Sequence, residues 1–234
     1  MILLKNNLVA IAYKTGYCGS LVYALCAMSP EVQQYMKFDD LTFENGTAHE
    51  VGEQWFNDLH DYRDSLEVCE QNWPNYLTSK AKQALTNDGL VMFRCHPNIA
   101  NKLAFIENLK VLYLTHRNKY LPERWAYEKV YKPRGDDFYQ QDLQRLFGTQ
   151  KVFALTNQIK RTQLIKNLNH QVVSWQQIQN NLRTTPFLVK IDRLLDKDYL
   201  TYVELCNYLK ISPMDDCKFY NIISKYNQRQ WKRF

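Results

Sequence analysis

The chain has 234 residues, of which 45% are hydrophobic and 14% aromatic, enough to bury one sizeable core. Seven glycines and seven prolines leave no flexible linker, repeat or low-complexity tract, so we expect a single domain over 1–234. The balance of 30 basic against 24 acidic residues gives a net charge of +6, which favours an anionic ligand. The basic residues are dispersed along the chain, and we therefore expect no nucleic-acid partner.

Six cysteines are scattered through the chain without a Cys-x-x-Cys pair or a zinc-type histidine spacing. This pattern predicts free thiols in a reducing compartment and no metal site. No apolar run approaches the roughly 20 residues that cross a bilayer, so we expect no membrane partner. No secretory signal is visible either, which predicts a cytoplasmic location.

The segment from Leu8 to Ser29 predicts an apolar strand over 8–13, a turn of small residues, and an amphipathic helix over 19–28. Gly16 and Gly19 would give the turn backbone angles that are closed to other residues. The N–H groups at the helix start would then face an anion, and Lys14 would add a positive charge. This pattern is typical of a phosphate-binding turn, with the candidate binding residues Lys14, Thr15, Gly16, Tyr17, Cys18, Gly19 and Ser20.

The order of residues in this turn differs from the Walker pattern, because the lysine precedes the glycines instead of following them. An ordinary ATPase or GTPase is therefore not indicated. Two other interpretations of the turn stay open. It is an ordinary connection between a strand and a helix, or Ser20 caps a helix that begins near Leu21.

Residues 31–86 are polar and aromatic, and they predict an insertion of helices and loops in which an acceptor pocket could form. Apolar runs predict three further strands, over 90–94, 110–115 and 187–192. Helical spacing predicts helices over 98–108, 121–132 and 199–210, and two or three more within 136–182. The alternation of strands and helices indicates an α/β fold with a central, mostly parallel sheet of four to five strands.

In a parallel sheet, the loops that follow the strands lie at one edge, where open α/β sheets bind their ligands. Besides the first turn, two more loops at this edge carry basic side chains. They are Arg94-Cys95-His96-Pro97 and Thr115-His116-Arg117-Asn118. Basic groups therefore follow three of the predicted strands.

These three loops with basic residues, in this order along the chain, resemble the motifs of the sulfotransferase family, the P-loop-like enzymes that use 3'-phosphoadenosine 5'-phosphosulfate (PAPS). Lys14-Thr15-Gly16 matches the front of the family's Lys-x-Gly-Thr-Thr loop, whereas Tyr17-Cys18-Gly19-Ser20 departs from its second half. Arg94-Cys95-His96-Pro97 is similar to the family's Lys-Thr-His element. Arg117-Asn118 keeps the opening of the third motif, although Lys119 and Trp125 stand where the family has proline and serine.

The resemblance implies a three-layer α/β/α fold and transfer of a sulfuryl group from PAPS to a hydroxyl or amine of a small molecule, glycan or peptide. It implies that the turn from Lys14 to Ser20 binds the 5'-phosphosulfate and that Arg117 binds the 3'-phosphate. His96 would take the acceptor's proton, and Lys14 would neutralise charge on the leaving phosphate without a metal. The small size and the abundance of Asn, Lys and Tyr are similar to phage-encoded members, whose location would be the host cytoplasm.

Alternatives to these roles stay open. His96 is equally well explained as a hydrogen-bonded loop histidine, and Arg117 as a surface partner of Glu123 or another carboxylate. The missing proline and serine after Arg117 allow a catalytically inactive sulfotransferase-like binding or structural protein. A nucleotide or nucleoside kinase shares the strand, turn and helix, but it would need Mg²⁺ and normally a Lys-Ser or Lys-Thr pair at the end of the loop, which is absent here.

Overall fold

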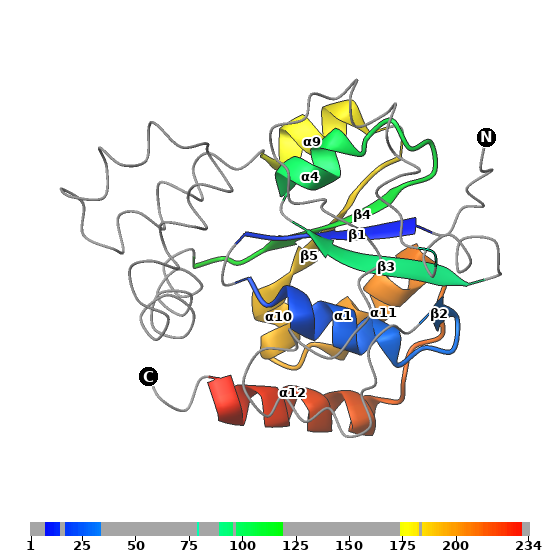
Figure 1. Cartoon of the computed structure of the whole chain (residues 1–234). Coiled ribbons are helices and arrows are strands. Elements are labelled where there is room, and N and C mark those ends of the chain that lie inside the picture. Colours follow the sequence, from blue (N-terminus) through cyan, green and yellow to red (C-terminus); the bar gives the residue numbers. More distant parts are fainter. Residues whose placement is uncertain are drawn as a thin grey trace.

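The computed structural model has a parallel sheet between two layers of helices, the three-layer α/β/α arrangement (Figure 1). The residues that it describes are 8–14, 17–33, 79, 89–95, 97–118, 174–182 and 184–230. Most of the expected insertion at 31–86, the helix at 121–132 and most of the helical region at 136–182 lie outside these residues. The predicted fold class is confirmed in the part of the chain that the structure describes.

The sheet has five strands in the order β2-β3-β1-β4-β5, and every neighbouring pair is parallel. The strands are β1 (Leu8–Ala12), β2 (Val32–Gln33), β3 (Leu90–Cys95), β4 (Lys110–Thr115) and β5 (Phe187–Lys190). β1 lies at the centre between β3 and β4, and all five of its residues are buried. Strands covered on both faces are nearly continuous apolar runs, which explains why the sequence predicted β1, β3 and β4 to within a residue.

Three elements differ from the sequence-based expectation. β2 was not predicted, because its two residues carry no periodic signal. The fourth predicted strand ends at Lys190 rather than 192, since helix α10 (Ile191–Leu195) begins directly after it. The helix expected over 98–108 is the shorter α4 (Pro97–Lys102), and turns follow it. These turns bury Leu103 and Ile106, so they reproduce a helical spacing of apolar residues without a helix.

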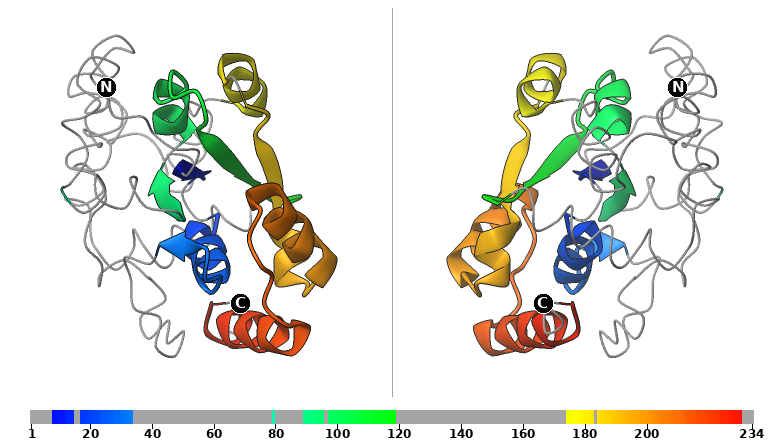
Figure 2. Two further views of the ribbon diagram at one scale, coloured as in Figure 1. Left: turned by 90° about the vertical axis from the view of Figure 1, so that its right-hand side faces the viewer. Right: turned by 90° about the vertical axis from the view of Figure 1, so that its left-hand side faces the viewer.

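Two groups of helices cover the two faces of the sheet (Figure 1). One face carries α4 and α9 (Trp175–Asn181). The other carries α1 (Gly19–Ala27), α10 and α11 (Tyr199–Leu209), with α12 (Asp216–Gln230) outermost, as Figure 2 also shows. Alternate side chains of β1 serve the two layers. Val9 and Ile11 belong to the core under α1, whereas Leu8, Ala10 and Ala12 belong to the core under α4.

The outermost helix α12 is attached to α11 through aromatic side chains. The ring of Phe219 stacks on that of Tyr202 with 5.2 Å between centroids, and the Tyr202 hydroxyl accepts the amide N–H of Met214 at 3.2 Å. Both rings are fully buried.

Among the described residues, no helix combines the length and the apolar character needed to cross a bilayer.

Candidate functional site

The turn between β1 and α1 is closed by a backbone hydrogen bond. The amide of Tyr17 donates to the carbonyl of Lys14 at 3.0 Å, and α1 begins two residues later at Gly19. The first turn of α1 contains no acidic side chain. Because the first amides of a helix have no earlier carbonyl within it, this end of α1 presents N–H donors and the positive end of the helix dipole. The local chemistry is therefore suited to an anion.

Cys18, not Gly19, takes the left-handed conformation in this turn, with φ 56° and ψ 33°. The expectation that Gly19 supplies unusual backbone angles is therefore wrong. Gly19 is required for a different reason, because a β-carbon there would lie 2.3 Å from Cε1 of Tyr13. The Tyr13 ring packs against the start of α1, so a side chain at position 19 would force this ring to shift.

The side chain of Cys18 is held by the C-terminal helix. The hydroxyl of Tyr226 in α12, which is buried, donates a hydrogen bond to the Cys18 sulfur. Burial raises the pKa of the Cys18 thiol to about 11, and the Tyr226 hydrogen bond opposes this only in part. The thiol is therefore neutral at pH 7 and is not a nucleophile. The Cys18 side chain therefore stabilises the turn through packing and its hydrogen bond with Tyr226.

Ser20 connects α1 to the neighbouring strand β3. Its Oγ accepts a hydrogen bond from Nη1 of Arg94 at 2.5 Å. The interpretation of Ser20 as the helix cap is wrong, because the capping position is Cys18 and no side-chain hydrogen bond caps it. The sequence placed Arg94 among the basic groups at this edge but gave it no role of its own, because no local pattern connects it to the start of α1. Its guanidinium lies beside the first turn of α1.

β1 and β3 are neighbours, yet the chain leaves their carboxyl ends toward opposite faces of the sheet. After β1 it continues into α1, and after β3 it continues into α4 on the other face (Figure 1). Ligands of open α/β sheets bind outside the carboxyl ends at the point where the connections diverge in this way. Lys14 follows β1 by two residues, and Arg94 is the last residue but one of β3. Both basic residues therefore border the divergence point.

Three of the candidate residues, Thr15, Gly16 and His96, lie outside the described residues. In the chain, His96 stands between Cys95, the last residue of β3, and Pro97, the first of α4. The proposed role of His96 as a base therefore stays a prediction, and so do the contacts of Thr15 and Gly16 with an anion.

Arg117 lies at the same edge of the sheet, two residues after β4, the other neighbour of β1. Its Nη2 is 3.5 Å from Oδ2 of Asp196, and its Nε is 4.0 Å from Oδ2 of Asp192. The amide of Arg117 also donates to Asp192 at 3.3 Å. The side chain is 73% exposed. Arg117 thus pairs with two carboxylates of the segment after β5, as the surface-pair alternative expects, whereas Glu123 lies outside the described residues.

The neighbouring His116 is a less suitable base than its position suggests. Its Nδ1 accepts the amide N–H of Asn118 at 2.9 Å. Burial lowers the pKa of the imidazole, against a smaller opposing effect of the Asp192 charge. The ring is therefore neutral near pH 7, with its proton on Nε2, and neither nitrogen is ready to accept a proton.

A metal group is not evident at this edge among the described residues. In the part of the chain that the structure describes, the cluster with a metal-like spacing is Asp215, Asp216 and Cys217, which has its ligand atoms within 4.8 Å of one another but is exposed at the start of α12, away from this edge. Exposed acidic groups of this kind are common without an ion.

The chain matches no protein-family model and no curated protein. The chemistry of the sheet edge is thus the basis for a functional assignment.

Proposed function

We propose that this protein is a PAPS-dependent sulfotransferase that transfers a sulfuryl group to a hydroxyl or amine of a small molecule, glycan or peptide. The observation that carries the proposal is the meeting of the anion-suited turn after β1 with Arg94 of β3, where the chain diverges to the two faces of the sheet. Two cationic residues and a helix N-terminus at such a point favour a ligand with a phosphate or sulfate group. The resemblance of the three loops to sulfotransferase motifs supplies the choice of PAPS.

The proposed chemistry is an in-line displacement at sulfur. The acceptor oxygen or nitrogen forms a bond to sulfur while the bond between sulfur and the 5'-phosphate oxygen breaks, and its electron pair stays on the phosphate. His96 accepts the acceptor's proton, and the products are the sulfated acceptor and adenosine 3',5'-bisphosphate. Lys14 and the amides at the start of α1 stabilise the negative charge that develops on the leaving phosphate.

Arg117 is the proposed partner of the 3'-phosphate, although it pairs with Asp192 and Asp196 in the structure. Exposed ion pairs contribute only about 0–1 kcal/mol, so a phosphate can compete for a guanidinium that is 73% exposed. A divalent phosphate also accepts the planar, two-pronged hydrogen bonds that arginine offers. The proposal therefore requires the Arg117 side chain to exchange its carboxylate partners for the nucleotide.

The same pairing also favours a second candidate, a sulfotransferase-like binding or structural protein without activity. If Asp192 and Asp196 keep Arg117, the 3'-phosphate has no arginine partner in this loop. Such a protein would bind adenosine 3',5'-bisphosphate weakly or not at all. A nucleotide or nucleoside kinase, the third candidate, would bind ATP in the presence of Mg²⁺ more tightly than the bisphosphate.

The test is a set of thermal unfolding and calorimetric titrations of the full chain with adenosine 3',5'-bisphosphate, adenosine 5'-monophosphate, and ATP with Mg²⁺. A ligand that binds only the folded state raises the melting temperature. We expect the bisphosphate to give the largest shift and the Lys14→Gln variant to reduce it, while Lys218→Gln on the exposed side of α12 leaves it unchanged. The absence of any shift with the bisphosphate contradicts the proposal, and a larger shift with ATP and Mg²⁺ supports the kinase instead.

A further inference from the structure

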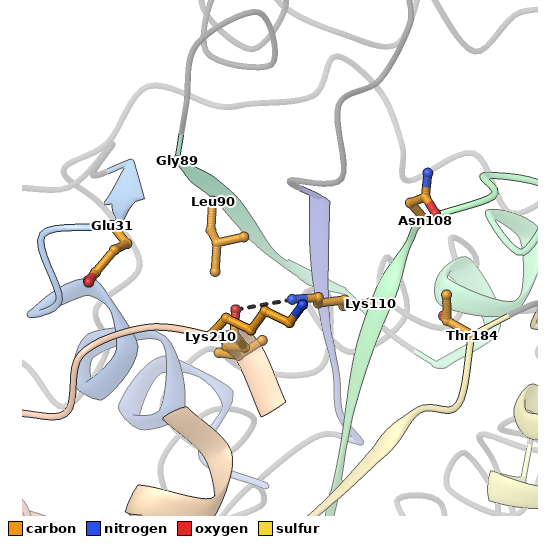
Figure 3. Close-up of a pocket in the computed structure, with 8 residues that line it drawn as sticks. Glu31, Gly89, Leu90, Asn108, Lys110, Thr184 and Lys210 are labelled. Atoms are coloured by element: carbon orange, nitrogen blue, oxygen red, sulfur yellow. Dashed lines mark hydrogen bonds between the residues drawn. The ribbon is translucent and has the colours of Figure 1, made fainter. Parts of the chain in front are cut away.

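Two lysines lie close together at the opposite end of the strands, away from the basic residues at the carboxyl edge. Lys110 is the first residue of β4, and Lys210 follows the last residue of α11. Both line a pocket of about 390 Å³, whose wall also includes Leu90 at the start of β3 (Figure 3). Because β3 and β4 begin here, the pocket is at the amino edge of the sheet and is separate from the turn after β1.

Lys110 is fixed within this pocket by its surroundings. Its Nζ donates a hydrogen bond to the carbonyl of Leu209 at 3.0 Å, drawn as the dashed line in Figure 3. It also lies 6.0 Å from the ring centroid of Tyr208. The carbonyl belongs to the last turn of α11, so the lysine satisfies a helix-end acceptor and complements the dipole. An ammonium group has three N–H donors, and this bond uses one of them. The directions of the other two N–H donors are also set, because this hydrogen bond holds the Lys110 side chain in place.

Capping of the helix end does not explain the position of Lys210, the second lysine of the pocket. Lys210 is exposed and adopts the left-handed conformation with φ 61°, and its side chain extends toward Lys110 (Figure 3). Burial lowers the pKa of Lys110, and the positive charge of Lys210 lowers it further, so the two ammonium groups repel one another. Among the described residues, no carboxylate lies within ion-pair distance of either lysine.

The acidic residue of the pocket, Glu31, is engaged elsewhere. Its carboxylate accepts hydrogen bonds from the Ser212 hydroxyl at 2.6 Å, from the Ser212 amide at 3.2 Å, and from the Ser29 hydroxyl. These bonds lower the pKa of Glu31 to about 2, so it remains ionised. The lining charges of Lys110, Lys210 and Glu31 therefore sum to a net positive pocket in which the two cations are adjacent and the anion is bound by serines.

We infer that this pocket binds a compact oxyanion of the phosphate or sulfate type, held between the ammonium groups of Lys110 and Lys210. The anion replaces the repulsion between the two lysines by two charge-assisted hydrogen bonds. Asn108 and Thr184 line the pocket on the far side of Lys110 (Figure 3), where Asn108 adds an amide, whereas the Thr184 hydroxyl donates to the carbonyl of Leu109. Leu90 and Leu209 line the remaining part, which suits the carbon skeleton of a phosphomonoester.

The test is a titration of the full chain with inorganic phosphate at constant ionic strength, followed by NMR at the amides of Gly89, Asn108, Lys110 and Lys210. We expect saturable shifts at these four amides. The Lys210→Gln variant should weaken the apparent affinity at least about tenfold, equivalent to about 1.4 kcal/mol. Lys210 is exposed, so this variant is expected to fold.

Two matched variants make the result specific. Lys218→Gln removes an equal charge from α12, and Lys14→Gln removes one from the turn after β1, so both should leave the saturable shifts at the four pocket amides unchanged. Shifts that do not saturate, that are insensitive to Lys210→Gln, or that are confined to residues 14–20 overturn the inference. A parallel titration with glycerol 3-phosphate distinguishes the two sources of this anion, because tighter binding identifies a phosphomonoester and equal binding a free inorganic anion.

Discussion

The aromatic ring of Tyr13 occupies the space that a β-carbon on Gly19 would need. The two residues lie on either side of the turn that joins β1 to α1, and the ideal β-carbon position is 2.3 to 2.6 Å from three ring atoms of Tyr13. Real β-carbons do not approach other heavy atoms so closely. The packing of this ring therefore fixes the distance between the strand end and the start of the helix, and with it the position of the anion-suited amides.

Gly19→Ala should destabilise the protein by about 1–2 kcal/mol, because the ring must shift within a packed region. In a Tyr13→Ala background the same change should be neutral or stabilising, since alanine is favoured over glycine in a helix by about 1 kcal/mol. Urea unfolding of the two single variants and the double variant measures this coupling. Equal effects of Gly19→Ala in both backgrounds would show that the Tyr13 contact does not constrain the turn.

Arg94→Met should weaken binding of adenosine 3',5'-bisphosphate at least about tenfold, because it removes a guanidinium from the start of α1, and a hydrogen bond to a charged group contributes about 1.5–3 kcal/mol. Ser20→Ala is the control, since it removes the hydroxyl that Arg94 contacts but keeps the charge. It should lower the affinity much less. Isothermal titration with both variants checks this, and an equal loss in the two would mean that Arg94 only positions α1.

Much of the fold could be predicted from the sequence because the central strands are apolar along their whole length. β1, β3 and β4 are buried on both faces, so each gave a continuous run that a helix or a loop would not contain. β2 gave no such run, because two residues are too few. The turns that follow α4 were mistaken for helix, since Leu103 and Ile106 are buried at a spacing that helices also use.

The site was less predictable because its contacts join residues that are far apart in the chain. The Lys14 turn was visible as a local pattern, but the hydrogen bond between Arg94 and Ser20 spans 74 positions and depends on the pairing of β1 with β3. The contact of Tyr226 with Cys18 likewise depends on how α12 packs. A single sequence contains no signal for such contacts, and the left-handed Cys18 could not be foreseen at a residue type that rarely adopts it.

Glu31 should make the stability of the protein depend on pH in the acid range. Hydrogen bonds from Ser212 and Ser29 lower its pKa from 4.5 to about 2 in the folded protein. The resulting stabilisation is fully present above the unfolded value and is lost as the pH falls from about 4.5 toward 2. The difference in urea midpoint between the wild type and Glu31→Gln should therefore be constant above pH 4.5 and shrink below it. A difference independent of pH would mean that the serines do not favour the ionised form.

Lys197→Gly should stabilise the protein by about 1 kcal/mol. Lys197 follows α10 with φ 66°, a conformation that costs a residue with a β-carbon about 1 kcal/mol and that glycine adopts freely. The matched control is Lys218→Gly, an exposed position inside α12, where the same substitution should destabilise by about 1 kcal/mol. Melting temperatures that move in the same direction for both variants would contradict the conformational explanation.

Asp196→Asn should strengthen the binding of adenosine 3',5'-bisphosphate if Arg117 is the partner of the 3'-phosphate. The carboxylate of Asp196 is 3.5 Å from Nη2 of Arg117 and is itself 63% exposed, so its neutralisation frees the guanidinium with little effect on folding. Exposed pairs of this kind contribute about 0.2–1 kcal/mol, which predicts a gain in affinity of about 1.4- to fivefold. Adenosine 5'-monophosphate lacks the 3'-phosphate and should gain less, and Glu204→Gln on α11 provides a control for the change in net charge. A gain that is the same for both nucleotides would assign the effect to the overall field of the protein and leave Arg117 as a surface partner of Asp192 and Asp196.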